Sequence, residues 1–376
     1  MRVTLERSHL LRALNHAHRV VERRNTIPIL ANVLLNADGG ALSLKATDLD
    51  LEASESVAAD VNQGGTTTVP AHLLYDIVRK LPEGGEVSLA TTPEGNSMTV
   101  ASGRSRFTLQ VLPASDFPDL QAGTFPIRFT LPAGSLKGLI DRTQFAISTE
   151  ETRYYLNGIY LHTTTLSGAN GGRRVLRAVA TDGHRLAQAQ IDLPAGAEAM
   201  PGVIVPRKTV GEIEKLLDAS GDDVTIELSD TRIRVTIGAV ILTSKLIDGT
   251  FPDYQRVIPQ GNDKVLKVDR QEFAGAVDRV STISSERGRA VKLALADGRL
   301  TLSVTNPDSG SAVEELGVDF AAPPVEIGFN SRYLLDINGQ LHSGTTVFRL
   351  ADPGSPTLIQ DEGESDALYV LMPMRV

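Results

Sequence analysis

Residues 3–10 read VTLERSHL, and two later stretches, FTLPAGSL at 129–136 and LKVDRQEF at 266–273, repeat the same pattern. In each stretch, apolar and polar residues alternate and then give way to apolar residues one helical turn apart. Alternation is typical of a strand with one buried face, and the later spacing is typical of an amphipathic helix. The sequence therefore predicts a strand that runs directly into a helix, and it predicts this unit three times.

A second element recurs in the same order along the chain. Strand-like residues lead into helical spacing at 69–77, 205–213 and 329–337, and each copy ends with an acidic residue followed by isoleucine. Two copies place proline, and one places asparagine, where a helix would begin; proline is tolerated in the first turn and asparagine can cap it. Each repeat is therefore expected to contain two helices.

The repeat is as long as a whole domain. Corresponding alternating segments end near Thr47, Thr181 and Thr305, which is too wide a spacing for a short solenoid unit. A Phe-Pro-Asp motif at 117–119 and at 251–253 closes the first two copies, and a polar linker follows each. We expect an α+β protein of three repeated domains, each with two helices packed on antiparallel sheets. The predicted domains are residues 1–124, 125–260 and 261–376.

Composition excludes several classes of protein. The 376 residues contain no cysteine, which excludes a disulfide framework, a thiolate zinc site, an iron–sulfur cluster and a cysteine nucleophile. No run of about 18 apolar residues could span a membrane. The first residues lack the apolar region of a signal peptide, so a cytoplasmic location is expected.

The formal net charge of −9 is unevenly distributed. Lys and Arg outnumber Asp and Glu on the six predicted helices, so the rest of the chain is more acidic than the total. For any one helix, a solvated face is the simpler interpretation. Because the excess recurs on one type of element, we expect the helices to form a positive surface that holds a phosphate backbone without reading bases. The predicted helices span residues 7–24, 71–81, 134–147, 206–217, 270–287 and 330–341.

Only residues 181–185, which read TDGHR, have the makings of a catalytic site. Asp182 could orient the imidazole of His184 as a general base, and Arg185 could bind an anion. The alternative is a turn between strands, with Asp182 and Gly183 supplying its geometry. No nucleophile, metal-ligand cluster or known phosphate-loop motif accompanies the pair in the sequence. The sequence argues against an enzyme and predicts neither a cofactor nor a metal.

Two further segments have a bearing on function. Residues 168–174 are rich in glycine but precede a strand, so a long hairpin loop is expected there instead of a phosphate cradle. Residues 368–371 are expected to form an edge strand that docks the C-terminus. Beyond them, Met372 and Met374 flank a proline, and flexible methionines suit the binding of varied partners.

Motifs along essentially the whole chain resemble those of bacterial DNA polymerase III β subunits, the sliding-clamp family. They include GRSRF at 103–107, RYYLNG at 153–158, ATDGHRL at 180–186, FPDY at 251–254 and VLMPMR at 370–375. The resemblance implies three domains of one fold and a head-to-tail homodimer that closes into a ring lined by helices. It also implies that the ring encircles duplex DNA without sequence preference and performs no catalysis.

The resemblance further implies a set of partners. These are a second copy of the chain, duplex DNA, the catalytic subunit of DNA polymerase III, the clamp-loader complex, and other polymerases and repair proteins that carry clamp-binding peptides. The peptides are expected in a pocket between the second and third domains. No membrane partner is implied.

Candidate site residues follow from the resemblance and from helix charge. DNA contacts implied by the resemblance are Arg24, Tyr154, Tyr155, Arg207 and Lys208. Those added from helix charge alone are Arg7, Arg12, Arg79, Lys80, Lys137, Arg142, Arg279 and Arg332. The implied peptide pocket comprises Leu156, Thr181, Gly183, His184, Arg185, Leu186, Pro252, Arg256, Val257, Asn330, Tyr333, Val370, Met372, Pro373, Met374 and Arg375. The implied dimer contact comprises Arg104, Arg106, Phe107, Leu109, Thr282, Ile283, Glu314 and Glu315.

Several positions depart from the family pattern. Gly354 and Pro356 stand where valine and serine are common at the pocket edge, and Val376 replaces the usual leucine. Thr282 is more polar than expected at the ring contact, and the loop at 167–174 is long. Two rival functions stay open on the sequence. One is an enzyme that uses Asp182 and His184, and the other is a scaffold that binds proteins but not DNA.

Overall fold

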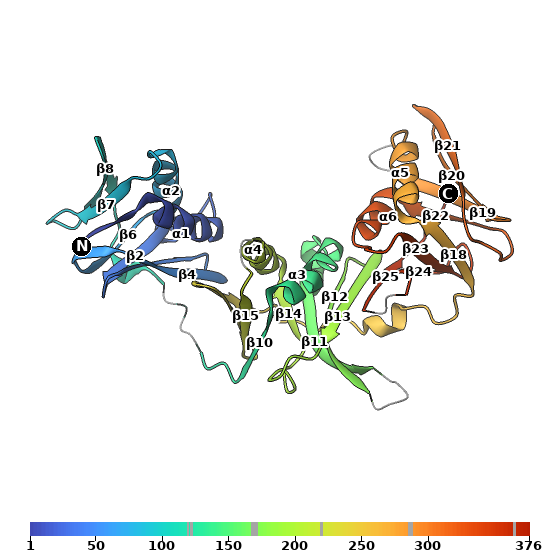
Figure 1. Ribbon diagram of the computed structural model, residues 1–376, viewed down its shortest axis with the longest axis horizontal. Coiled ribbons are helices and arrows are strands. Elements are labelled where there is room, and N and C mark those ends of the chain that lie inside the picture. Colours follow the sequence, from blue (N-terminus) through green and yellow to red (C-terminus); the bar gives the residue numbers. More distant parts are fainter. Residues whose placement is uncertain (119, 121–122, 167–171, 219–220, 285–288, 364–365) are drawn as a thin grey trace. The chain divides into compact units, whose positions relative to one another are not determined.

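The computed structural model describes residues 1–118, 120, 123–166, 172–218, 221–284, 289–363 and 366–376. They form two compact units. Figure 1 labels many of the helices and strands of the chain. The first unit combines residues 1–134 with 211–246, and the second combines 135–210 with 247–376. Residues 167–171 of the expected hairpin loop lie outside the described residues, but Leu166 and Arg173 on either side are paired as antiparallel neighbours.

The first unit holds one five-stranded and one eight-stranded sheet, and every strand pairing in them is antiparallel. The five-stranded sheet has the order β5 (Asp60–Gln63), β1 (Arg2–Glu6), β7 (Glu86–Thr91), β8 (Ser97–Ser102) and β9 (Ser105–Gln110). The eight-stranded sheet has the order β10 (Ile127–Pro132), β15 (Asp223–Leu228), β16 (Arg232–Ile237), β17 (Val240–Lys245), β4 (Leu51–Ala58), β3 (Ala41–Thr47), β2 (Asn32–Asp38) and β6 (Gly65–Pro70).

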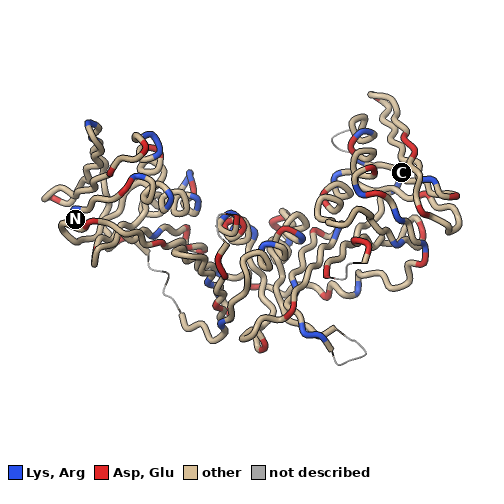
Figure 2. Tube along the Cα trace, viewed as in Figure 1, with Lys and Arg blue, Asp and Glu red and all other residues tan. Residues whose placement is uncertain are grey.

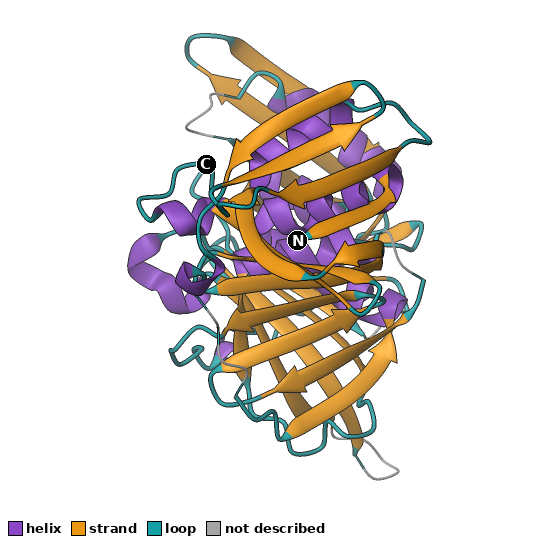
Figure 3. Cartoon of the chain, turned by 90° about the vertical axis from the view of Figure 1, so that its left-hand side faces the viewer, coloured by secondary structure: helices purple, strands orange, loops and turns teal. Residues whose placement is uncertain are grey.

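Helix α1 (Arg7–Val20) lies between these two sheets. It contacts β1 and β7 of one and β3 and β4 of the other, and Leu10 and Leu14 on it are fully buried. Each such leucine contributes about 2 kcal/mol through removal of its apolar surface from water. Helix α2 (Ala71–Lys80) packs against α1, β2 and β6. Figure 3 shows helices lying against strands. The buried residues of α1 include Leu10, Leu14 and Ala17, which lie one helical turn apart, so the apolar stripe read from the sequence faces the core.

The second unit repeats this plan. Helix α5 (Arg270–Ser281) contacts strands of both its sheets and packs against α6 (Ser331–Asn338). The eight-stranded sheet has the order β14 (Val203–Pro206), β11 (Gly158–Leu166), β12 (Arg173–Thr181), β13 (Arg185–Asp192), β25 (Ala367–Leu371), β24 (Thr357–Asp361), β23 (Thr345–Leu350) and β18 (Lys264–Asp269). The four-stranded sheet has the order β21 (Gly310–Gly317), β20 (Arg299–Asn306), β19 (Ala290–Ala296) and β22 (Val325–Asn330).

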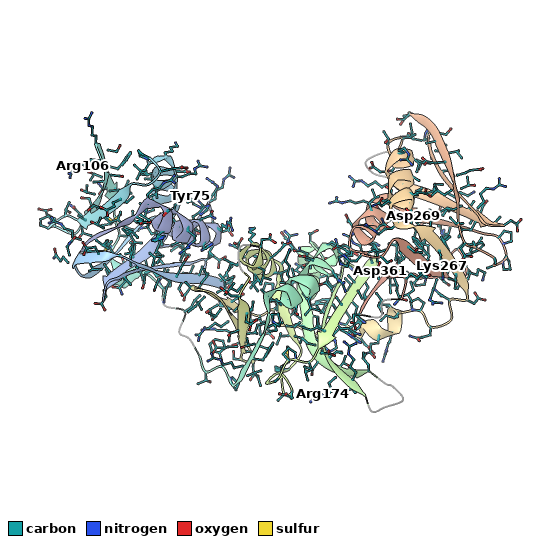
Figure 4. The ribbon with its side chains drawn as sticks, viewed as in Figure 1. Tyr75, Arg106, Arg174, Lys267, Asp269 and Asp361 are labelled. Atoms are coloured by element: carbon teal, nitrogen blue, oxygen red, sulfur yellow. The ribbon has the colours of Figure 1, made fainter. Side chains whose placement is uncertain are left out.

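The predicted transition from strand to helix is confirmed at all six places. Strands β1, β10 and β18 run into α1, α3 (Ala133–Asp141) and α5, and strands β6, β14 and β22 run into α2, α4 (Arg207–Leu217) and α6. Two of these helices are capped by the residue before them: the carboxylate of Asp269, labelled in Figure 4, and the amide oxygen of Asn330 each accept two backbone N–H bonds. The α+β class with antiparallel sheets is confirmed as well.

Four of the predicted helices extend several residues beyond the C-terminal ends that the structure shows. Helices α1, α3, α5 and α6 end at Val20, Asp141, Ser281 and Asn338, so Arg24 and Arg142 lie outside them. Beyond α3, the Thr143 hydroxyl donates to the Leu139 carbonyl at 2.6 Å and so satisfies one of the groups left free at a helix end. The positive excess is consequently confined to α1, α2 and α4, because α3, α5 and α6 carry equal numbers of basic and acidic residues.

The expectation of a C-terminal edge strand was wrong. Strand β25 lies in the interior of its sheet, between β13 and β24. Leu371 is paired with Arg185 on one side and with Thr357 on the other, and Tyr369 is fully buried. Hydrogen bonding along both edges joins the strands of the predicted central repeat to those of the third. In the same way, β17 of the predicted central repeat pairs with β4 of the first. Because these pairings join neighbouring repeats, the compact units do not follow the three repeats, and the domain boundaries at 124 and 260 stay a prediction.

Candidate functional site

An apolar pocket of about 270 Å³ opens in the second unit. Four segments supply its walls: the 3₁₀ turn η4 (Glu151–Leu156), the turn between β12 and β13, residues 252–257 with the 3₁₀ turn η5 (Tyr254–Val257), and the end of β25. Its lining residues are Arg153, Tyr155, Leu156, Thr181, Gly183, Arg185, Leu186, Pro252, Asp253, Tyr254, Val257, Val370 and Met372.

Nine of the predicted pocket residues line this cavity: Leu156, Thr181, Gly183, Arg185, Leu186, Pro252, Val257, Val370 and Met372. The remaining seven, His184, Arg256, Asn330, Tyr333, Pro373, Met374 and Arg375, are not part of its lining. Sequence reasoning missed Arg153, Asp253 and Tyr254, and it assigned Tyr155 to DNA alone. The available signal was adjacency, since all four lie in the same short motifs as Leu156 and Pro252.

The segment 181–185 is a turn that is closed by hydrogen bonds among its own residues. The Asp182 carboxylate accepts the backbone N–H groups of His184 and Arg185 at 2.9 and 3.0 Å, and the Thr181 hydroxyl donates to the Arg185 carbonyl. Gly183 has φ +90°, and a Cβ there would lie 2.5 Å from a guanidinium nitrogen of Arg153. Because Asp182 is engaged by the turn, its carboxylate does not orient the His184 imidazole, and the turn interpretation holds.

Arg185 ties the turn to α6 and to η3 (Gln144–Ala146). Its guanidinium donates to Asp182 at 3.1 Å, to Asp336 at 2.6 Å and to the Phe145 carbonyl at 2.6 Å. It also lies 4.1 Å above the centre of the Tyr333 ring, and that ring stacks with His184. Charge-assisted bonds and a cation–π contact on one buried arginine fix this wall of the pocket.

The C-terminal tail lies along the rim of the pocket. The Met372 N–H donates to the His184 carbonyl at 2.9 Å, and the Met374 N–H donates to the Gly328 carbonyl at 2.7 Å. Met372 and Met374 are 40% and 36% exposed, so both side chains are available to a ligand. A Cβ on Gly328 would meet the Val376 side chain at 2.3 Å, which shows how closely the tail approaches β22.

The predicted dimer residues lie on two sheet edges. Arg104 precedes β9, and Arg106, Phe107 and Leu109 lie on it; Arg106 is labelled in Figure 4. Glu314 and Glu315 belong to β21, the outermost strand of the four-stranded sheet, while Thr282 and Ile283 follow α5. Phe107 is 38% exposed, and Leu109 is buried. The Arg279 guanidinium donates to the Glu314 carboxylate, which lowers the pKa of Glu314.

Figure 2 shows Lys and Arg in blue and Asp and Glu in red along the chain. Many of the basic residues predicted to contact DNA already have acidic or carbonyl partners. Ion pairs within 4.0 Å link Arg12 to Glu55, Arg79 to Asp76, Lys137 to Asp141, Arg279 to Glu314 and Arg332 to Asp336. Arg7 donates to the Val78 and Arg79 carbonyls at the end of α2. Within the described residues, Arg24, Lys80 and Arg207 are exposed and lie in no ion pair. Tyr154 is 53% exposed and packs edge-on against Tyr155.

Among the described residues, no cluster of three or more His, Asp or Glu side chains is arranged to hold a metal ion. None of the helices found there combines the length and the apolar character needed to cross a bilayer.

Comparison with known proteins identifies the family. Three family profiles match in order: the N-terminal, central and C-terminal domains of the DNA polymerase III beta subunit, at residues 1–121, 130–253 and 255–375. A beta sliding clamp of Caulobacter vibrioides is 53% identical, and one of Escherichia coli is 41% identical, each over the full length of both chains. The crystal structure of a Bartonella birtlesii sliding clamp bound to griselimycin is 57% identical, with full coverage of both chains and a TM-score of 0.96.

Proposed function

The chain belongs to the bacterial DNA polymerase III β subunit family of sliding clamps, non-catalytic processivity subunits, and we propose that two copies close head to tail into a ring around duplex DNA. The ring tethers the catalytic subunit of DNA polymerase III and is placed on DNA by a clamp-loader complex. Other polymerases and repair proteins bind it through the same pocket. It works in the cytoplasm, where bacterial DNA is copied.

Complementary sheet edges carry this proposal. Strands β9 and β21 are outermost in their sheets, so each presents a row of backbone N–H and C=O groups that another strand can pair with. Arg106 lies on β9 and Arg104 directly before it, whereas β21 carries Glu314 and Glu315, which pair with Arg279 and Arg299 of the same chain. Opposite charges favour the head-to-tail register over pairing of like edges. Burial of Phe107 and of Val313, which is 66% exposed, would supply apolar contact.

Distributed positive charge supports the encircling of DNA. The exposed basic residues Arg24, Lys80 and Arg207 lie in or next to the helices with an excess of positive charge. Many other basic side chains are held in ion pairs. Each contact with a phosphate adds to affinity and to its dependence on salt. A ring that is linked to DNA by its topology needs only weak attraction of this kind, because tight local contacts would stop it from sliding.

The apolar pocket supports a binding site for partner peptides. Its walls combine Leu156, Leu186, Val257 and Val370 with a few polar groups, which is the usual character of a ligand site. The related clamps of Bartonella birtlesii and Pseudomonas aeruginosa are bound to griselimycin in their crystal structures. We infer that this chain binds griselimycin in the pocket, in competition with partner peptides.

The decisive experiment measures assembly and topology together. Native mass should be about 80 kDa, twice the 40.3 kDa of one chain, and protein loaded onto closed circular DNA should be released when the circle is cut. Replacing Arg207 and Lys208 with glutamate should impair loading, while the same replacement at Lys264 and Lys267 on β18 controls for net charge. A monomer at micromolar concentration, or equal retention on cut and closed DNA, would overturn the ring. Unchanged loading of the Arg207/Lys208 variant would favour a scaffold.

A further inference from the structure

A row of polar side chains crosses the sheet behind the pocket. His162 on β11 is paired with Arg177 on β12, and Arg177 is paired with Gln190 on β13. Arg177 is only 7% exposed, and its guanidinium donates twice to the Gln190 amide oxygen, at 2.7 and 3.1 Å. Among the described residues Arg177 contacts no carboxylate; Asp366 is reached only through Gln190. A buried cation without an acidic partner is unfavourable in itself, so this row calls for an explanation.

Tyr254 connects this row to the pocket. Tyr254 lines the cavity, and its hydroxyl lies 3.1 Å from an Arg177 nitrogen and 3.0 Å from Nε2 of His162. On β13, Gln190 of this row and the pocket residue Leu186 are four residues apart, so they lie on the same face of the sheet. Tyr254 therefore spans the distance from the polar row to the apolar cavity.

The directions of these hydrogen bonds are determined by their partners. Nδ1 of His162 lies 3.1 Å from the Thr163 carbonyl, which can only accept, so Nδ1 carries the proton. In the neutral ring Nε2 is then an acceptor, and the Tyr254 hydroxyl donates to it. The same hydroxyl oxygen accepts from Arg177, which always donates. Burial and, more weakly, the Arg177 charge lower the pKa of His162, which favours the neutral ring that this arrangement needs.

We propose that Arg177 and His162 are positioning residues for the pocket, which hold the Tyr254 ring in the orientation that ligand binding requires. Neither side chain lines the cavity; both act through the Tyr254 hydroxyl. Without the hydrogen bonds to its hydroxyl, the Tyr254 ring can leave its position in the pocket wall. The apparent affinity then falls in proportion to the fraction of molecules in which the wall is formed. This inference rests on the proposed function of the pocket.

The test is the affinity of the full-length protein for griselimycin, measured by titration calorimetry. Arg177→Met should weaken binding by about fivefold to tenfold, the usual effect of losing one hydrogen bond. Tyr254→Phe, which removes the bonds to both Arg177 and His162, should weaken it by at least as much. The double variant should bind no more weakly than Tyr254→Phe alone, because that change already removes the hydroxyl through which Arg177 acts. Tyr160→Phe is the matched control, since it removes a hydroxyl from a ring that stacks on His162 but lies outside the bonded row. Arg177→Lys should restore part of the affinity.

Each outcome bears on one of the two proposals. Failure of the wild-type protein to bind griselimycin would overturn the proposed pocket, and this inference with it. Wild-type binding with equal affinity in Tyr254→Phe would overturn only the positioning role. Additive losses of affinity in the double variant, or an equal loss of affinity in Tyr160→Phe, would also overturn the positioning role, because they would indicate a general loosening of the packing around Tyr254. If Arg177→Met does not fold, Tyr254→Phe and its control decide the question.

Discussion

Arg185 is the most heavily connected side chain of the pocket, and its replacement by methionine tests how the pocket is held together. Methionine keeps the length and apolar bulk of the arginine stem but removes the guanidinium. The change breaks bonds to Asp182, Asp336 and the Phe145 carbonyl, and it removes the cation above the Tyr333 ring. The Asp182 and Asp336 carboxylates then lose the cation that they share, and among the described residues Asp336 keeps only the Arg332 contact at 4.0 Å.

The expected cost follows from burial. Breaking a fully buried ion pair costs about 3–5 kcal/mol, because one charge is left unpaired. Here the Asp182 and Asp336 side chains are 16% and 30% exposed, so water can solvate them in part. Loss of the cation–π contact adds about 1 kcal/mol. We expect a net loss of about 3 kcal/mol, which lowers the thermal midpoint of a unit of about 200 residues by about 6–12 °C.

Scanning calorimetry and urea unfolding of Arg185→Met, Asp336→Asn and the double variant measure this effect. The coupling energy between the two positions should be about 1–2 kcal/mol, since they share a hydrogen bond of 2.6 Å. Arg185→Lys should recover only part of the loss, because an ammonium cannot reproduce the planar fork of the guanidinium. A loss below about 1 kcal/mol in Arg185→Met, with no coupling, would refute the claim that this arginine stabilises the wall.

Three further expectations concern the tail, pH and assembly. Gly328→Ala should displace the C-terminal tail and weaken griselimycin binding by about tenfold or more, because a Cβ there would lie within 3 Å of tail atoms. The control is Gly261→Ala, where a Cβ would point into open space and binding should be normal. Burial lowers the pKa values of His18 and His162 below 6.5, so the unfolded chain binds more protons than the folded chain. Their contribution to stability is therefore full above pH 6.5 and should fall as the pH drops below it. Urea midpoints at high and low pH measure this fall, and unchanged midpoints would contradict it. Phe107→Asp should shift the native mass from dimer to monomer in sedimentation, and a dimer that persists would place the contact elsewhere.

The parts of the fold with a local pattern could be predicted. A strand running into a helix needs only alternation followed by helical spacing, and both are visible in eight residues such as 266–273. The turn at 181–185 could likewise be predicted, because Asp182 and Gly183 are residue types that favour turn geometry. The helix ends were not, since a bond such as that from Thr143 to the Leu139 carbonyl is not visible in periodicity.

Features that depend on distant residues escaped the sequence. The pairing of β25 with both β13 and β24 is a long-range choice, and an apolar strand at a chain end looks the same at the edge of a sheet as in its interior. The pocket role of Tyr254 depends on Arg177 and His162, which are 77 and 92 residues away. The Glu314 partner of Arg279 is 35 residues away, so the charge on α5 looked more positive than its surroundings allow.

That last difference changes how the charge on the helices is understood. On the sequence, each basic helix residue counted equally toward a positive surface. In the structure, acids on the same or a neighbouring element accompany Lys137, Arg279 and Arg332, and only α1, α2 and α4 keep a surplus. Exposed ion pairs contribute little to stability, about 0–1 kcal/mol each, so their main physical effect is to weaken the local field. The proposed ring, which would stay on DNA without stopping on it, gains from this arrangement, because attraction to phosphate is reduced where it would otherwise accumulate.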